Sequence, residues 1–301
     1  MPSIFGSALY SISSNDTQSQ IFVDKGYTEF EYLKDQFNQY HEKFLGKSIK
    51  VLKGTFSLRS DYDDAWLMYL SQNANIIFDV GCNIGKSAFI ISQSDSLKKI
   101  FMIDPNPLSL SRASENLILN NMSENKMFIC KAAYHKSGNK VKLWTMPGPF
   151  AGASIDIEFT QTSSITKNYF EVDTTTLDDV ANSKNSYPDL IKIDVEGAEY
   201  LVLKGAVEIA KKGNAKFIVE VHSAENLSIV ENTDKILSWC KDNDYTAYYL
   251  KKHLELEDSK LIENRGRYHL LLINKDKKYP QELKNIKQGE MLENIKARNF
   301  D

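Results

Sequence analysis

From residue 76 onward, short apolar runs alternate with segments whose apolar residues recur at helical spacing, and this alternation limits the fold more than any other feature. The apolar runs are IIFDV, KIFMID, KMFICK, LIKIDV, KFIVEV and YTAYYL. The helical segments include SLSRASENLILNN, AEYLVLKGAVEIAKK and TDKILSWCKDN. Strands that are apolar on both faces and separated by helices predict a doubly wound α/β domain with a mostly parallel sheet.

A seventh apolar run, RYHLLLI, follows YTAYYL without room for a long helix, so we expect it to pair antiparallel. This makes a sheet of seven strands. We assign residues 61–275 to this α/β domain. The stretch at about 145–170 breaks the rhythm with turn residues and short β-prone pieces, and we interpret it as an insert over the sheet edge.

Both ends of the chain are expected to be helical. The segment TEFEYLKDQFNQYHEKFLG predicts a helix within an N-terminal extension, residues 1–60. Its apolar stripe consists of Phe30, Leu33, Phe37, Tyr40 and Phe44. Residues 276–301 predict a solvated helical tail, with a dimer contact or a lid over the site as the alternatives.

Composition and charge exclude several classes of protein. With 42% hydrophobic and 26% charged residues, the chain is typical of a soluble globular protein. A net charge of -3 argues against a partner bound mainly through nucleic-acid phosphates. The three cysteines are far apart and form no CxxC pair, which favours a reducing, cytoplasmic location. No leader and no apolar run of ~18 residues is present, so we expect no membrane partner.

Two glycines follow the first apolar run, in NIIFDVGCNIGKSAFII. In a doubly wound sheet, glycines in this turn let the backbone approach a ligand, and the next helix offers free N–H groups to an anion such as a pyrophosphate or a carboxylate. The turn is not a dinucleotide fingerprint, because Asn83 and Lys86 stand where its second and third glycines belong. It is not a P-loop either, since only three residues separate Gly81 from Gly85.

An acidic residue ends the next strand. Asp104, in MIDPN, lies 25 residues after Asp79, close to the spacing of about 20 at which a carboxylate meets a ribose diol. A glycine turn and this carboxylate together suit an adenosine with a small anionic tail, which is the shape of S-adenosylmethionine. The alternative is a plain strand-to-helix turn with Asp104 as a helix cap.

The motifs FDVGCNIG, IDPNP, TTTLDD, LIKIDVEGAE and FIVEVH, in this order over about residues 76–222, resemble the FkbM family of S-adenosylmethionine-dependent methyltransferases. Cys82 replaces the alanine usual in the first motif. The resemblance implies a Rossmann-like sheet of class I methyltransferase type, with S-adenosyl-L-methionine as the cofactor. It implies that the cofactor is bound by Asp79, Gly81, Asn83, Gly85, Asp104 (at the ribose), Asn106 and Ala132 (near the adenine).

Methyl transfer to a hydroxyl requires a group that removes the proton, and acidic candidates follow the last parallel strands. We expect Asp194 or His222 to be the base, with Glu196 beside them. Glu199 is equally explained by the dipole of the helix it begins, and His222 by a structural role. Asp194, Glu220 and His222 also suit a divalent metal, but their spacing is not diagnostic and we predict none.

The region just before the first strand adds Tyr62, Asp63 and Asp64, which either reach the mouth of the site or cap a helix. We predict an O-methyltransferase acting on a sugar, glycan or secondary metabolite; the acceptor class comes from the resemblance. Three alternatives remain: transfer to nitrogen, a non-catalytic adenosyl-nucleotide-binding protein, and a nicotinamide oxidoreductase. The expected partner is a small-molecule or glycan acceptor, and a homodimer is left open.

Overall fold

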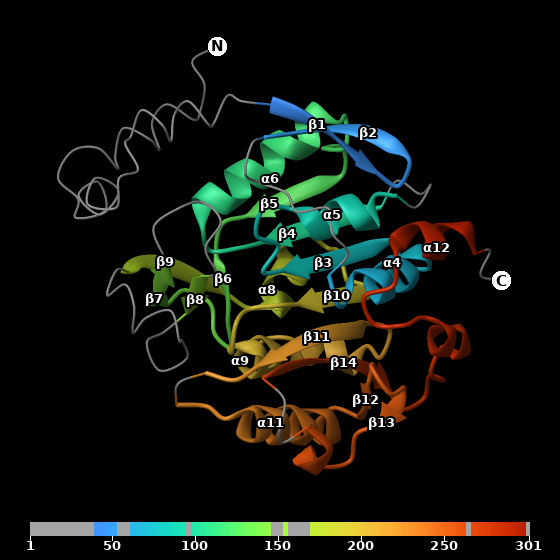
Figure 1. The fold of residues 1–301 in the computed structure, drawn as a ribbon. Helices are drawn as coiled ribbons and strands as arrows, with labels where there is room; N and C mark the ends of the chain where they lie inside the picture. The colour runs from blue at the N-terminus through green and yellow to red at the C-terminus, as the bar shows by residue number, and fades with distance from the viewer. Residues whose placement is uncertain are drawn as a thin grey trace.

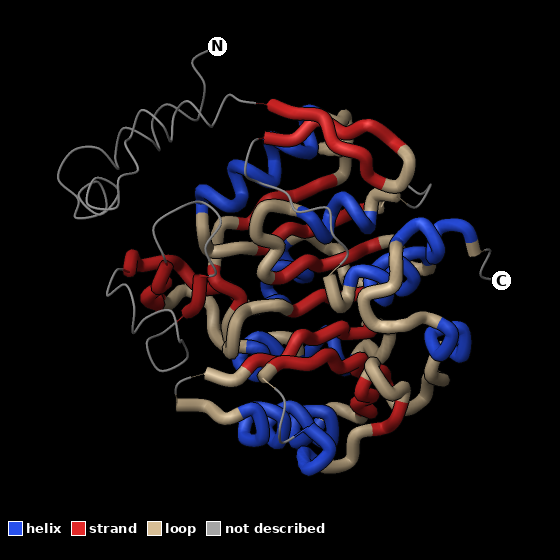
Figure 2. The backbone as a smooth tube through the Cα atoms, viewed as in Figure 1, coloured by secondary structure: helices blue, strands red, loops and turns tan. Residues whose placement is uncertain are grey.

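An eight-stranded sheet runs through the centre of the computed structural model, with helices on both sides (Figures 1 and 2). The residues that the structure describes are 39–52, 61–93, 98–145, 153–155, 169–224, 226–262 and 266–298. From one edge of the sheet to the other, the strands are β13 (Leu254–Glu255), β12 (Tyr245–Tyr249), β14 (Arg267–Asn274), β11 (Lys216–His222), β10 (Leu190–Ile193), β3 (Ile76–Val80), β4 (Lys99–Ile103) and β5 (Lys126–Ile129).

The directions of the strands confirm the predicted doubly wound sheet. The five adjacent strands from β11 to β5 are all parallel to one another. Strand β14 lies between β11 and β12 and is antiparallel to both, as the sequence predicts. All seven predicted strands are present, and the two-residue β13 adds an eighth at the edge.

Alternate residues of the central strands enter two separate cores, because successive side chains point to opposite faces. Ile77 belongs to one core and Phe78 to the other. The first core is covered by α4 (Asp64–Gln72), α5 (Lys86–Ile91), α6 (Pro107–Leu119), η3 (Gln281–Asn285) and α12 (Leu292–Ala297). The second is covered by α8 (Leu177–Ser183), α9 (Glu199–Lys204), α10 (Val207–Lys211), α11 (Ile229–Asp242) and η2 (Ser259–Ile262).

The predicted N-terminal helix is wrong where the structure describes it. Strands β1 (Gln39–Phe44) and β2 (Lys47–Leu52) form an antiparallel hairpin. Leu45 and Gly46, with φ of 51° and 78°, supply the left-handed pair that a two-residue hairpin turn needs. Tyr40 and Phe44 are four apart, a spacing that places them on one face of a strand as well as of a helix. The stripe members Phe30, Leu33 and Phe37 lie outside the described residues.

The hairpin is attached to α6 by side-chain amides. Asn120 accepts a hydrogen bond from the Lys50 N–H at 2.9 Å and donates one to the Lys50 carbonyl at 2.6 Å. Asn116 accepts from the Leu52 N–H at 2.9 Å. The two asparagines therefore satisfy the hydrogen-bonding groups of the β2 backbone on the edge that faces away from β1.

The single helix predicted over AEYLVLKGAVEIAKK is divided into α9 and α10 at Gly205. A Cβ on Gly205 would lie 2.2 Å from the backbone oxygen of Tyr134, so only glycine fits this approach. The Gly205 carbonyl accepts from the Asp178 N–H instead of continuing the helix. Tertiary contact overrides helical periodicity here.

A second, smaller sheet holds β6 (Ala132–Ala133), β9 (Tyr169–Thr175), β7 (Lys140–Thr145) and β8 (Ala153–Ile155), in that order. Strand β8 lies within the stretch assigned to the insert and pairs antiparallel with β7, which ends where that stretch begins. The rest of that stretch, 146–152 and 156–168, lies outside the described residues. Within the ranges given above, no helix is both long enough and apolar enough to cross a membrane.

Candidate active site

The turns that follow β3 and β10 touch at the carboxyl edge of the sheet. Gly81 has φ of 78°, and a Cβ placed on it would lie 1.8 Å from the backbone oxygen of Asp194. The chain leaves β3 toward β4 and β5 and returns to β10 on the other side, so this is the point at which the strand order reverses. Ligands of doubly wound sheets bind in the crevice at that point.

The second glycine fixes the start of α5. Gly85, at φ of 87°, is the residue before the helix, and its Cβ would meet the Ala113 Cβ of α6 at 3.0 Å. Asn83, between the glycines, also has a positive φ, of 45°. The turn is therefore in close contact with α6 on one side and with the residue that follows β10 on the other.

Asp104 lies beside this turn. Its carboxylate accepts the Asn83 N–H at 2.9 Å and the Asn106 N–H at 2.8 Å. Burial raises the pKa of Asp104 to about 6, although both backbone N–H groups lower it. The cap of α6 is Asn106, whose side chain accepts from the Leu108 N–H, so the alternative interpretation of Asp104 as the helix cap is wrong.

Asp79 is fully buried beneath the turn, at the end of β3. Its Oδ2 accepts a hydrogen bond from the Ser87 hydroxyl, whereas its Oδ1 has no hydrogen-bond partner among the described residues. Burial raises the pKa of Asp79, and the Lys192 ammonium opposes this. Ala132 is also fully buried, on β6, where it pairs with Thr174.

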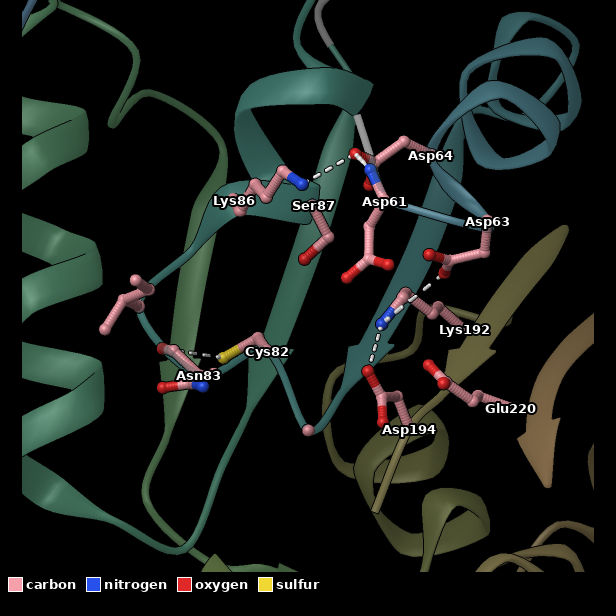
Figure 3. A pocket seen from close by; sticks show the side chains of 12 residues that line it. Asp61, Asp63, Asp64, Cys82, Asn83, Lys86, Ser87, Lys192, Asp194 and Glu220 are labelled. Carbon is pink, nitrogen blue, oxygen red and sulfur yellow. Dashed lines mark hydrogen bonds and ion pairs between the residues drawn. The ribbon is translucent and has the colours of Figure 1, made fainter. Parts of the chain in front are cut away.

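A cavity of about 440 Å³ opens between the glycine turn and the start of α4 (Figure 3). It is lined by Asp61, Asp63, Asp64, Gly81, Cys82, Asn83, Ile84, Lys86, Ser87, Lys192, Asp194 and Glu220. Of the predicted site residues, Gly81, Asn83 and Asp194 line it. The lining does not include the other predicted site residues, Asp79, Gly85, Asp104, Asn106, Ala132, Glu196 and His222.

The start of α4 contributes acidic side chains to this cavity. Asp63 is the N-terminal cap residue, but its side chain makes no capping hydrogen bond. Asp64 instead accepts from the Asp61 N–H at 2.6 Å and pairs with Lys86 at 2.7 Å. Tyr62 is 51% exposed, with the Arg267 guanidinium 5.3 Å from the centre of its ring.

Lys192, in the middle of β10, is a functional candidate that the sequence analysis missed. Its Nζ lies 2.9 Å from Asp194 Oδ2 and 3.9 Å from Asp63 Oδ2 (Figure 3). Burial lowers the pKa of Lys192, but Asp194, Asp63 and Asp79 raise it well above its ordinary value, so the side chain stays an ammonium. The available signal was a lysine within the otherwise apolar run LIKIDV.

His222 is held by a buried clamp. Its Nδ1 lies 2.9 Å from Glu199 Oε1, and Asn232 donates to Glu199 Oε2 at 2.8 Å and to the His222 carbonyl at 3.0 Å. Burial lowers the pKa of His222, but Glu199, Glu220 and Glu196 raise it to about 12. An imidazolium of this kind has no free lone pair to accept a proton, which favours Asp194 over His222 as the base.

Two glutamates beside His222, Glu199 and Glu196, make contacts that the sequence analysis did not predict. Glu199 is fully buried and accepts the Gly197 N–H at 2.9 Å, so it does more than complement a helix dipole. Glu196, at φ of 54°, lies with its Oε2 3.6 Å from His222 Nε2. Burial raises the pKa of Glu196, and His222 opposes this.

Glu220, on β11, uses its two oxygens differently. Oε1 is 3.1 Å from the Arg267 guanidinium and 3.6 Å from His222 Nε2, whereas Oε2 faces His269 Nε2 at 3.5 Å. Burial alone would raise the pKa of Glu220. His222 and His269 lower this pKa by more than burial raises it, so the carboxylate stays ionised. Arg267 and His269 are two more site residues that the sequence analysis did not single out.

The residues around the glycine turn fit an adenosyl cofactor. Gly81 and Gly85 let the turn pack directly against Asp194 and Ala113, and one buried oxygen of Asp79 has no hydrogen-bond partner among the described residues. Asp104 has both carboxylate oxygens oriented by backbone N–H groups, and each oxygen retains a lone pair for a ribose hydroxyl.

The reversed strand order, the glycine turn and the carboxylate after the next strand define a Rossmann-like domain of class I methyltransferase type. The family model described as "Methyltransferase FkbM domain" matches residues 79–247, more than half of the chain. The protein therefore belongs to the FkbM methyltransferase family, as the motifs indicated.

The chain is 26% identical over 204 residues to the hexuronic acid methyltransferase AglP of Haloferax volcanii, covering 67% of this chain and 78% of that protein. Among solved structures, it is similar to methyltransferase FkbM from Methylobacillus flagellatus KT, with 17% identity, a TM-score of 0.43 and coverage of 66% of this chain and 43% of that one. It is also similar to M. jannaschii TYW2 in complex with AdoMet, with 14% identity, a TM-score of 0.41 and coverage of 78% and 84%. At these TM-scores the fold assignment rests on the strand order.

Proposed function

We propose that the protein is an S-adenosylmethionine-dependent O-methyltransferase that acts on a hydroxyl of a sugar, glycan or secondary metabolite. The observation that carries this proposal is the contact between the glycine turn and the end of β10, beside a cavity lined with carboxylates. Family membership supports the transfer of a methyl group. The name of the Haloferax relative supports a sugar as the acceptor.

The cofactor side is assigned to residues around the glycine turn. Gly81, Asn83 and Gly85 supply the close backbone approach, Asp104 holds the ribose diol, and Asp79 lies buried below the turn. Asn106 fixes Asp104 through its N–H, and Ala132 flanks the adenine. When bound, S-adenosylmethionine supplies an activated methyl group, so the protein has only to place the acceptor and take its proton.

The acceptor side is assigned to the charged residues at the ends of β10 and β11. Asp194 lines the cavity with one oxygen held by Lys192. This leaves its other oxygen to accept the hydrogen bond of an acceptor hydroxyl and then its proton. His222 and Glu196 lie next to Asp194; His222 acts as a fixed cation that orients Glu220 and Glu196.

Calorimetric titration with S-adenosylhomocysteine, in parallel with NAD, tests the cofactor. We expect saturable binding of the former, strong weakening in Asp104→Ala, and no change in Asp173→Ala, a control on an exposed carboxylate of β9. Tighter binding of NAD, or an affinity for S-adenosylhomocysteine that is unchanged in Asp104→Ala, would contradict the cofactor assignment.

The acceptor is tested by following S-adenosylhomocysteine release with neutral hexosides, hexuronic acids and amino sugars. Asp194→Asn should abolish turnover with a hydroxyl acceptor while leaving cofactor binding intact. If Asp194→Asn keeps substantial turnover, the acceptor atom is a nitrogen that is already neutral. If the protein binds the cofactor and methylates none of a broad panel, the non-catalytic alternative gains support.

A further inference from the structure

His269 lies in the middle of β14 and has no function in the scheme above. Its side chain is 2% exposed. Neither ring nitrogen has a hydrogen-bond partner within the described part of the chain. The ring packs against Trp66 of α4 in a T-shaped arrangement, with the ring centres 5.7 Å apart and the planes at 61°. A buried imidazole with no hydrogen bond is costly, because both nitrogens lose their contacts with water.

The ring nitrogens are not isolated from oxygen atoms. Nε2 faces Glu220 Oε2 at 3.5 Å, longer than a normal hydrogen bond. One ligand atom each from Asp63, Glu220 and His269 lie within 4.8 Å of one another, and all three residues are buried. Donor atoms around a single ion at about 2.0–2.2 Å lie up to about 4.4 Å apart, so small side-chain movements would let these three atoms share one ion.

The neighbouring cations leave these three donor atoms accessible. Arg267 binds Glu220 through Oε1, the oxygen that does not face His269. Lys192 is bonded to Asp194 at 2.9 Å and is only 3.9 Å from Asp63, so it keeps its main partner if Asp63 binds another cation. The Asp63 side chain makes no hydrogen bond as a helix cap.

We propose that Asp63, Glu220 and His269 form a binding site for one divalent transition-metal ion at the charged end of the cavity. Two carboxylates with one imidazole suit ions such as Mn²⁺, Fe²⁺ or Zn²⁺. The ion would neutralise Asp63 and Glu220 and satisfy His269 Nε2. Asp63 and Glu220 also line the cavity, so the remaining coordination positions face the space assigned to the acceptor. The proposal of binding stands apart from the proposed methyl transfer; only a role for the ion in catalysis would rest on it.

This set of ligands is distinct from Asp194, Glu220 and His222, which also come together within 4.8 Å. In that second group, Asp194 is bonded to Lys192, and His222 faces carboxylates at both ring nitrogens, Glu199 at Nδ1 and Glu196 and Glu220 at Nε2. Of the two histidines, His269 is the one whose ring nitrogens have no hydrogen-bond partner among the described residues, which favours the group that contains it.

The test uses Mn²⁺ alone as the probe, with the full chain stripped of metal by a chelator and then dialysed. Electron paramagnetic resonance should show saturable binding of one ion per chain, with the ¹⁴N modulation of a bound imidazole. His269→Gln should remove the ¹⁴N modulation and weaken binding by at least about 100-fold, because it deletes a direct ligand. The modulation should persist in His222→Gln, and His41→Gln, on the exposed face of β1, should match the wild type.

Absence of saturable Mn²⁺ binding, or binding without imidazole nitrogen, overturns the proposal. Loss of the modulation in His222→Gln but not in His269→Gln also overturns it, since the ion would then belong to the other group. If His269→Gln does not fold, Asp63→Asn, which keeps the side-chain shape, must weaken Mn²⁺ binding instead. Titration of the same samples with S-adenosylhomocysteine separates the two proposals, since either ligand can bind without the other.

Discussion

The two halves of the candidate site are built by different means. The glycine-turn half, Gly81, Gly85 and Asp104, is made by backbone that approaches closely and by N–H groups that orient one carboxylate. The charged half, centred on Lys192 and Glu220, is made by side chains from the three strands β10, β11 and β14 and from the start of α4. The first half depends on steric fit and the second on charge balance, so they should fail under different perturbations.

The largest effect is expected from Lys192→Met. The substitution leaves the buried Asp63 and Asp79 and the half-buried Asp194 without their ammonium, and removing one partner of a buried pair costs about 3–5 kcal/mol. Denaturant unfolding at pH 7.5 should show this loss in the free energy of unfolding. At pH 5 the loss should shrink, because Asp63 has a pKa of about 6 and is then protonated. Lys278→Met, an exposed control, should change little. An equal loss at both pH values would contradict the charge-balance account.

Gly81→Ala should produce the next largest effect, in the glycine-turn half. The added Cβ meets the Asp194 carbonyl, and a positive φ adds strain of about 1–3 kcal/mol. We expect a loss of at least about 2 kcal/mol and no cofactor binding. Gly138→Ala is a matched control: its φ is 76° but nothing lies within 4 Å of the new Cβ. It isolates the contribution of φ; equal losses in both variants would show that contact with Asp194 is unimportant.

Affinity for S-adenosylhomocysteine should fall by about tenfold between pH 7 and pH 5. Under the proposed function, ionised Asp104 binds the ribose diol; burial raises its pKa to about 6, so binding at pH 5 must first remove a proton. Calorimetric titration over this range measures the change. Asp104→Asn should bind more weakly at pH 7 and show a flat profile. A profile that stays steep in this variant would assign the proton to another group.

The smallest effect concerns His222 and the pH dependence of stability. Its pKa is raised from 6.5 to about 12 in the folded protein. Its contribution is therefore full below pH 6.5 and is lost as the pH rises toward 12, at no more than about 1.4 kcal/mol per pH unit. Denaturant unfolding at pH 7 and pH 8 should show this decline. His222→Gln should flatten it and His41→Gln should not; a decline unchanged in His222→Gln would mean that another group carries it.

The glycine-turn half and the central sheet could be predicted from the sequence because their signals are local. Strand periodicity, two glycines and an acid at a fixed offset lie within 29 residues of one another, from Ile76 to Asp104. The charged half could not be predicted in the same way. Arg267 and His269 lie more than 40 residues beyond Glu220 in the sequence, and only the antiparallel pairing of β14 with β11 brings them beside it.

The errors have physical causes of the same kind. A spacing of four residues fits a strand face as well as a helix face, so Tyr40 and Phe44 did not distinguish β1 from a helix. Gly205 breaks a periodic helix because of the distant Tyr134 carbonyl. Lys192 was overlooked because a single charge inside an apolar run does not reveal which carboxylates will surround it.

The amides of Asn116 and Asn120 have a consequence for association between copies of the chain. An exposed strand edge is a template for pairing with another strand, which is a common route to aggregation and to domain-swapped assemblies. In this protein, the side-chain amides of Asn116 in α6 and of Asn120 at its end accept hydrogen bonds from the Leu52 and Lys50 N–H groups of β2, as a neighbouring strand would. A helix thus protects the edge of β2 against recruitment by a second molecule, without adding a strand to the fold.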